Sequence, residues 1–205
     1  ATQSSVNDAD AAWRAQLRGA IRTPEALAAA LALTPEERAG VAHLATLGRA
    51  LPLTITPHYL GLMDPHDASD PLRRQVVPVM AEFDATAWDR NDPLGEEDHE
   101  VTPHLIHRYP DRVLLLATDR CASYCRFCTR KRMVGQGPTP KASELDAAIA
   151  YIAEHPAIRE VILSGGDVLT LSDDKVGALL SRLRAIAHID IIRVASRVPV
   201  FLPQR

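Results

Sequence analysis

Threonine, proline and short amphipathic stretches dominate the first part of the chain. The pairs Thr23-Pro24 and Thr34-Pro35 each predict a helix that starts at a threonine cap, with proline in its first turn. An earlier helix is predicted after a cap at Asn7 or Asp8. Prolines recur from residue 51 to residue 110, which leaves room only for short helices. This pattern predicts an N-terminal arm made of helices and turns.

After Pro110 the pattern changes to apolar runs that alternate with amphipathic stretches. Strands are predicted at 112–118, 160–164 and 191–196, and helices at 143–155 and 172–183. The order strand, helix, strand, helix, strand implies parallel strands with right-handed crossovers. We therefore expect an α/β fold, a partial (β/α) barrel with about three parallel strands at 108–205, preceded by a helical arm at 1–107.

The end of the predicted sheet suggests a longer protein. Three parallel strands cannot close a barrel. The last strand would present an open apolar edge, which is a poor place for a natural domain to end. We therefore expect the chain to be a fragment, with the remainder beyond residue 205.

Composition and charge exclude some classes of function. The chain has 205 residues, of which 46% are hydrophobic and 24% charged, so it can bury a core. Its net charge of −3 argues against a nucleic-acid partner bound through bulk charge. No apolar run is long enough to span a bilayer, and the first ten residues do not read as a secretory signal. We expect a soluble, cytoplasmic protein with neither a nucleic-acid nor a membrane partner.

The three cysteines carry the strongest chemical signal. Cys121, Cys125 and Cys128 form a C-x3-C-x2-C pattern directly after the strand predicted at 112–118. An odd number of cysteines in one short loop is not a disulfide framework. Three thiolates can hold three irons of a [4Fe–4S] cluster and leave the fourth iron open to a ligand. Two alternatives stay open: a zinc site completed by a distant histidine, and three buried, reduced cysteines without metal.

The segment CASYCRFCTRKR at 121–132 resembles the radical S-adenosylmethionine (SAM) signature of the lysine 2,3-aminomutase family. The resemblance covers about residues 20 to 205. It includes ITPHYLGLMD at 55–64, DPLRRQVVP at 70–78, HRYPDRVL at 107–114, SGGD at 164–167 and RVASRVP at 193–199. It implies that the partial barrel is of the radical SAM type.

The resemblance also implies an activity. In this family a [4Fe–4S] cluster cleaves SAM to a 5′-deoxyadenosyl radical, which acts on an amino acid held by pyridoxal phosphate (PLP). The amino group then moves between neighbouring carbons, so the expected enzyme is an isomerase that converts L-lysine to β-lysine. It would need a one-electron reductant such as flavodoxin or ferredoxin, and family members associate into homo-oligomers.

Other functions stay open beside this one. Within the family they are a glutamate or arginine 2,3-aminomutase and a lysine aminomutase that serves a translation factor. Outside it stands a truncated, non-catalytic module that binds an iron–sulfur cluster or zinc.

Roles for single residues follow from the resemblance alone. The three cysteines would be the iron ligands, and Phe127 would lie against the adenine of SAM. The SAM amino group would be received by the segment Gly165, Gly166 and Asp167, with Ser196 also touching SAM. Glycines let a ligand approach the backbone at a strand end, and a carboxylate can accept a hydrogen bond from an ammonium group.

Basic residues on both sides of the cysteines complete the implied site. Arg108, Tyr109 and Arg112 would hold the PLP phosphate, and Arg130 would pair with the substrate α-carboxylate. The remaining cations of the basic run, among them Arg126, are expected to neutralise the cluster and cofactors or to face solvent. No catalytic residue is assigned, because the PLP-binding lysine of the family is expected beyond residue 205.

Overall fold

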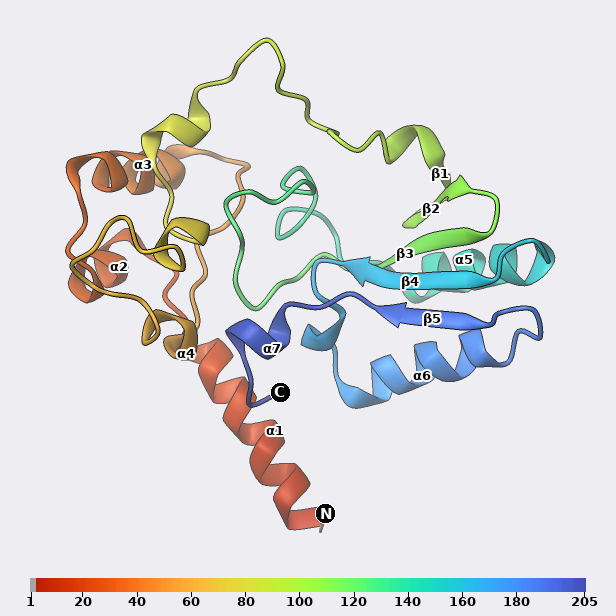
Figure 1. Ribbon diagram of the computed structural model, residues 1–205. Coiled ribbons are helices and arrows are strands. Elements are labelled where there is room, and N and C mark those ends of the chain that lie inside the picture. The colour runs from red at the N-terminus through yellow and green to blue at the C-terminus, as the bar shows by residue number, and fades with distance from the viewer. Residues whose placement is uncertain (1–2) are drawn as a thin grey trace. The chain divides into compact units, whose positions relative to one another are not determined.

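The computed structural model describes residues 3–205, with side chains from residue 11 onward (Figure 1). The described chain forms two compact units. The first, here called the arm unit, comprises the residues up to Asn91 together with Ala122–Arg132 and Val198–Arg205. The second, called the sheet unit, comprises Asp92–Cys121 and Met133–Arg197.

The arm unit is built from short helices. They are α1 (Gln3–Arg18), α2 (Pro24–Ala30), α3 (Pro35–Thr46), α4 (Pro57–Leu60), η1 (Arg73–Gln75), η2 (Met80–Phe83) and α7 (Val198–Phe201). The predicted caps of α2 and α3 are confirmed, because the hydroxyl of Thr23 accepts from the Ala26 N–H and that of Thr34 from the Glu37 N–H, both at 3.2 Å. The expected start of the first helix after Asn7 or Asp8 is wrong, since α1 already begins at Gln3.

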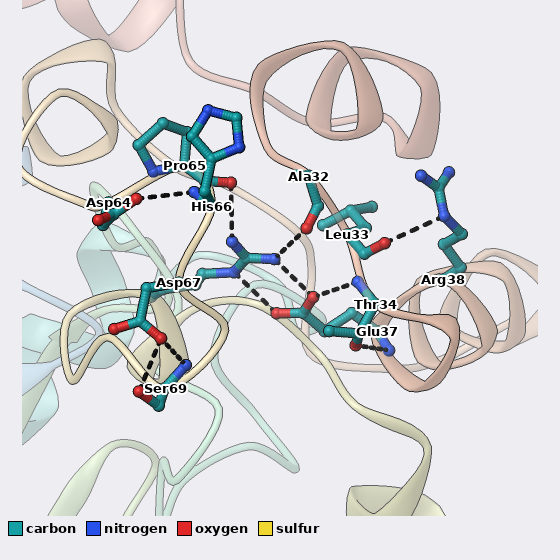
Figure 2. A network of polar contacts seen from close by, with 11 residues as sticks. Ala32, Leu33, Thr34, Glu37, Arg38, Asp64, Pro65, His66, Asp67 and Ser69 are labelled. Atoms are coloured by element: carbon teal, nitrogen blue, oxygen red, sulfur yellow. Dashed lines mark hydrogen bonds and ion pairs between the residues drawn. The ribbon is translucent and has the colours of Figure 1, made fainter.

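A buried arginine joins three segments of the arm unit, and its partners Ala32, Glu37 and Pro65 are labelled in Figure 2. Arg73, in η1, is fully buried and donates to both carboxylate oxygens of Glu37, at 2.8 and 2.6 Å. It also donates to the carbonyl oxygens of Pro65 and Ala32, at 3.0 and 2.9 Å. Burial works to raise the pKa of Glu37, but hydrogen bonds from Arg73 and Thr34 outweigh it and hold that pKa below its ordinary value.

The sheet unit contains a five-stranded mixed sheet in the order β1-β2-β3-β4-β5. Its elements are η3 (Glu97–His99), β1 (Glu100–Thr102), β2 (Leu105–Tyr109), β3 (Arg112–Thr118), α5 (Ala142–Glu154), β4 (Glu160–Gly165), η4 (Val168–Thr170), α6 (Asp173–Arg184) and β5 (Ile191–Val194). The three predicted strands are confirmed, although β5 ends at Val194 rather than at residue 196, and β3 pairs with β4 and β4 with β5 in parallel. The antiparallel pairs β1–β2 and β2–β3 are an addition to the prediction, and the sheet is not closed into a barrel.

The helices of the sheet unit cover one face of the sheet. Alternate positions of the parallel strands pack with α5 and α6 in a core that includes Val113, Leu115, Ala117, Val161, Leu163, Ile152, Leu179 and Leu183. Burying each large apolar side chain contributes about 1.5–3 kcal/mol. Because β3, β4 and β5 are parallel, the loops that follow them leave the same edge of the sheet, where folds of this class keep their chemistry.

The predicted boundary between residues 107 and 108 falls inside β2. As a division into domains it stays a prediction. None of the helices within residues 3–205 is both long and apolar enough to cross a bilayer.

Candidate active site

The cysteine loop leaves the carboxyl end of β3. Cys121 belongs to the sheet unit, whereas Cys125 and Cys128 belong to the arm unit, where the Cys128 N–H donates to the Cys125 carbonyl at 3.0 Å. None of the three cysteines forms a disulfide within the described residues, and all three are half-buried. Their chemistry fits an iron–sulfur cluster, since three thiols in one loop supply three ligands. Among residues 3–205 no three histidine, cysteine, aspartate or glutamate side chains gather into a metal-binding group, so convergence of the thiols stays a prediction.

The loop after β4 is hydrogen-bonded to the residues that lead into Cys121. The Gly166 N–H donates to the Thr118 carbonyl at 2.6 Å, and the Asp167 N–H donates to the Arg120 carbonyl at 2.7 Å. A Cβ on Gly166 would lie 2.2 Å from the Arg120 oxygen, and Gly165 has a φ of +123°. The two glycines therefore let two strand-end loops touch through their backbones. Their contact with SAM stays a prediction.

Asp167 joins the loops that follow β4 and β5. Its carboxylate is buried and accepts three hydrogen bonds: from the Leu169 N–H at 3.0 Å, from the Ser196 hydroxyl at 2.7 Å and from the Arg197 N–H at 2.6 Å. The structure thus brings together Asp167 and Ser196, which were expected to touch the same ligand. A carboxylate held by three donors from two loops has one preferred orientation.

The remaining residues expected near SAM and substrate lie in the arm unit. The Phe127 side chain is 64% exposed, and Arg130 is half-buried. An exposed phenyl ring offers a face on which a flat heteroaromatic group can stack. The roles of both residues stay predictions.

The β2–β3 hairpin brings Arg108, Tyr109 and Arg112 together. The guanidinium carbons of Arg108 and Arg112 lie 5.9 and 6.0 Å from the centroid of the Tyr109 ring. Arg108 donates to the Leu94 carbonyl at 2.9 Å, and Arg112 forms a two-pronged pair with Asp111 at 3.0 and 2.9 Å. These hydrogen bonds hold the pKa of Asp111 below its ordinary value. A phosphate on Arg112 would therefore have to displace or join Asp111.

The chain matches known proteins over nearly its whole length. The model of the Radical SAM superfamily matches residues 115–205. The L-lysine 2,3-aminomutase of Clostridium subterminale is 48% identical over 202 residues, which are 98% of this chain and 48% of that protein. The L-lysine 2,3-aminomutase of Bacillus subtilis (strain 168) is 45% identical over 194 residues, 94% and 41% of the two chains.

A relative with another printed substrate also matches. The glutamate 2,3-aminomutase of Clostridioides difficile (strain 630) is 36% identical over 206 residues, 98% and 48% of the two chains. The chain belongs to the lysine 2,3-aminomutase family of radical SAM proteins. It spans about half the length of the curated relatives it matches.

Membership of the family confirms the resemblance and the partial-barrel fold that it implied. It does not test the roles of single residues. The structure separates those residues into two groups within the sheet unit: Gly165, Gly166, Asp167 and Ser196 at the carboxyl edge of the parallel strands, and Arg108, Tyr109 and Arg112 beside the amino end of β3.

Sequence reasoning missed the place of Arg126. It was expected to neutralise bound groups or to face solvent, but its side chain is 8% exposed and pairs with Glu82, which lies 44 residues earlier in the chain. The expectation of solvent is wrong, because the guanidinium finds acceptors on the arm unit. Nothing in the local pattern around Arg126 could have signalled a partner so distant in sequence.

Proposed function

We propose that this chain carries the cluster and SAM site of an amino acid 2,3-aminomutase that acts on L-lysine. The observation that supports it is the loop pairing at the carboxyl edge of the sheet. The cysteine loop starts there, and the Gly166 and Asp167 N–H groups are hydrogen-bonded to its first residues at 2.6 and 2.7 Å. A C-x3-C-x2-C loop beside a glycine-rich strand end suits a cluster whose open iron faces a small ligand.

The cysteines and their neighbours have distinct roles in this proposal. Cys121, Cys125 and Cys128 hold a [4Fe–4S] cluster, which when bound supplies one electron to SAM. The backbone at Gly165 and Gly166 borders the ligand, and the ring of Phe127 covers the adenine. The Asp167 carboxylate, oriented by Ser196 and two N–H groups, either receives the SAM ammonium or fixes the loops that do.

The β2–β3 hairpin supplies a place for PLP, which when bound carries the amino acid. Two guanidinium groups and a phenol suit a phosphate dianion. The pair between Arg112 and Asp111 is about half exposed on both sides, so Asp111 can release the guanidinium to a phosphate. Arg130 pairs with the substrate α-carboxylate. None of the three lysines, Lys131, Lys141 and Lys175, is assigned to PLP.

Lysine is proposed as the substrate because relatives named for it reach 48% identity, against 36% for a relative named for glutamate. A one-electron reductant of the flavodoxin or ferredoxin class completes the reaction. The substrate is tested on the natural protein that contains this sequence, given lysine or glutamate in turn. Preference for glutamate would contradict the lysine assignment and leave the family unchanged.

The cluster and SAM roles are tested on the chain itself. After anaerobic reconstitution with iron and sulfide, we expect a brown protein that forms 5′-deoxyadenosine from SAM when dithionite is added. Cys125→Ala should lose cluster and product together, whereas Arg159→Gln, an exposed substitution, should keep both. A colourless protein with stoichiometric zinc would overturn the cluster. Product retained in Cys125→Ala would contradict the ligand assignment.

A further inference from the structure

Arg126 is anchored by all three nitrogens of its guanidinium group. Its Nε donates to the Oε2 atom of Glu82 at 2.9 Å, and its Nη2 pairs with the other carboxylate oxygen of the same residue. Its Nη1 donates to the carbonyl oxygens of Leu51 and Pro52, at 3.0 and 3.4 Å. The Arg126 side chain is 8% exposed and that of Glu82 20%. This arrangement, here called the loop clamp, lies wholly within the arm unit.

The acceptor side of the loop clamp, Glu82, lies in an element that packs against α3. Glu82 belongs to η2, and a Cβ added to Gly40 of α3 would come within 2.5 Å of the Val79 backbone just before η2. The ring of Phe83, next to Glu82, meets the ring of His43 of α3 edge to face at 4.7 Å. Glu82 is therefore held by tight packing on a helix rather than by a free loop.

The backbone of the loop is fixed at the same place. The Arg126 N–H donates to the carbonyl of Gln75, the last residue of η1, at 2.8 Å. Cys125 is the residue before Arg126, and Cys128 is two residues after it, in the turn closed by the hydrogen bond from the Cys128 N–H to the Cys125 carbonyl. Cys121 is anchored differently, since the residues before it bind the loop after β4 in the sheet unit.

We propose that Arg126 is a positioning residue, which acts through Glu82 to hold Cys125 and Cys128 where a cluster needs them. The inference rests on the proposed function, because only a bound cluster makes the positions of these thiols matter. A two-pronged guanidinium–carboxylate pair restricts both the rotation and the translation of the loop. Ligands held in place before binding lose less conformational entropy when the cluster binds.

The test measures thiol reactivity in the metal-free chain, residue by residue. Arg126→Lys keeps the positive charge but loses the planar fork, so a change in reactivity reports geometry rather than charge. Each thiol is alkylated with iodoacetamide under anaerobic conditions, and its rate is followed by peptide mass spectrometry. We expect Cys125 and Cys128 to react about tenfold faster than in the wild type, because the local opening free energy falls. Cys121 should change by less than about twofold, since its anchors are in the other unit.

A second variant and a control keep the test decisive. Glu82→Gln removes the negative charge from the other side of the clamp and replaces one of its two acceptor oxygens with an NH2 donor. It should show the same selectivity if Arg126→Lys is found unfolded by circular dichroism. Arg159→Gln, which breaks an exposed pair with Asp190 at 2.9 Å, should leave all three rates unchanged. Equal acceleration of the three thiols in folded variants, or no acceleration, would overturn the proposal.

The result is independent of SAM chemistry. If the variants show selective acceleration while the wild type makes no 5′-deoxyadenosine after reconstitution, the loop clamp stands and the proposed function fails. If the wild type makes 5′-deoxyadenosine while the three thiols respond alike, the function stands and the clamp fails. In a reconstituted sample, the clamp further predicts that Arg126→Lys releases iron to a chelator about tenfold faster than Arg159→Gln, in line with the loss of a charge-assisted pair.

Discussion

Arg73 and Arg126 both bind a glutamate of the arm unit through two guanidinium nitrogens, but they stabilise different parts of the protein. Arg73 is fully buried, and its acceptors come from the segments around Ala32, Glu37 and Pro65. Arg126 keeps 8% of its side chain exposed, and its partner Glu82 keeps 20%. The first pair joins segments within the arm unit, whereas the second fixes the segment that carries Cys125 and Cys128 to η2.

The comparison shows that the free-energy cost of breaking a guanidinium–carboxylate pair depends on how deeply the pair is buried. Removing one partner of a fully buried pair leaves a charge with no access to water, and the fold must bear that penalty. A pair at a partly open position can rehydrate, so its loss acts mainly on local motion. We therefore expect substitutions at Arg73 to change global stability and substitutions at Arg126 to change the loop.

The largest effect is expected from Arg73→Leu. It strands the buried Glu37 carboxylate and the carbonyls of Ala32 and Pro65, so the free energy of unfolding should fall by about 3–5 kcal/mol. Urea unfolding followed by circular dichroism measures it. The double variant Arg73→Met with Glu37→Leu should recover part of the loss, because no charge is then left buried. A loss below about 1 kcal/mol in the single variant would break the comparison.

A smaller effect is expected from Arg126→Leu. Glu82 can reach water once the arginine is gone, so the free energy of unfolding should fall by about 1–3 kcal/mol. The same urea titration gives the value. If Arg126→Leu lowered the free energy of unfolding as much as Arg73→Leu, the two pairs would not differ in their contribution to stability.

The pH dependence of stability sharpens the comparison further. The pKa of Glu37 lies below its ordinary value, so its contribution is present above the unfolded pKa of about 4.3 and is lost as the pH falls through the folded pKa. Urea midpoints of unfolding are measured from about pH 6 to about pH 3, the range in which carboxylates titrate. As the pH is lowered, the midpoint should therefore fall less steeply in Glu37→Gln than in the wild type. Equal slopes would contradict the assigned role of the Arg73 pair.

The smallest effect is expected from Arg159→Gln, which removes an exposed pair of the sheet unit. The side chains of Arg159 and Asp190 are 63% and 57% exposed. Such pairs contribute little, because water screens both charges. The urea midpoint should equal that of the wild type within error. A clearly lower midpoint would mean that exposure does not determine how much these pairs contribute to stability.

The parallel strands could be predicted from the sequence, but the hairpin before them could not. Within β3, the stretch from Val113 to Ala117 is continuously apolar, which favours a buried strand of a parallel sheet. The strand Leu105–Tyr109 contains histidine and arginine and is flanked by prolines, so its local pattern resembles a turn. It becomes a strand because β3 offers it a partner, which no local window contains.

The same limit applies to the candidate site. The spacing of the cysteines carries its own chemistry, so the loop could be recognised directly. The contacts that fix its surroundings join residues far apart, 44 positions between Arg126 and Glu82 and 29 between Asp167 and Ser196. A single sequence contains no signal for such pairings, because each partner alone reads as an ordinary polar residue.

One consequence of β3 concerns length. The strand has seven residues, and at about 3.3 Å per residue it measures roughly 20 Å from the hairpin to the cysteine loop. The strand thus sets the distance between the hairpin that carries Arg108, Tyr109 and Arg112 and the loop that starts before Cys121. Lengthening β3 by two residues would move its two ends apart by about 7 Å while keeping every side chain on its face. Groups at the two ends would then be too far apart for bound molecules of fixed size.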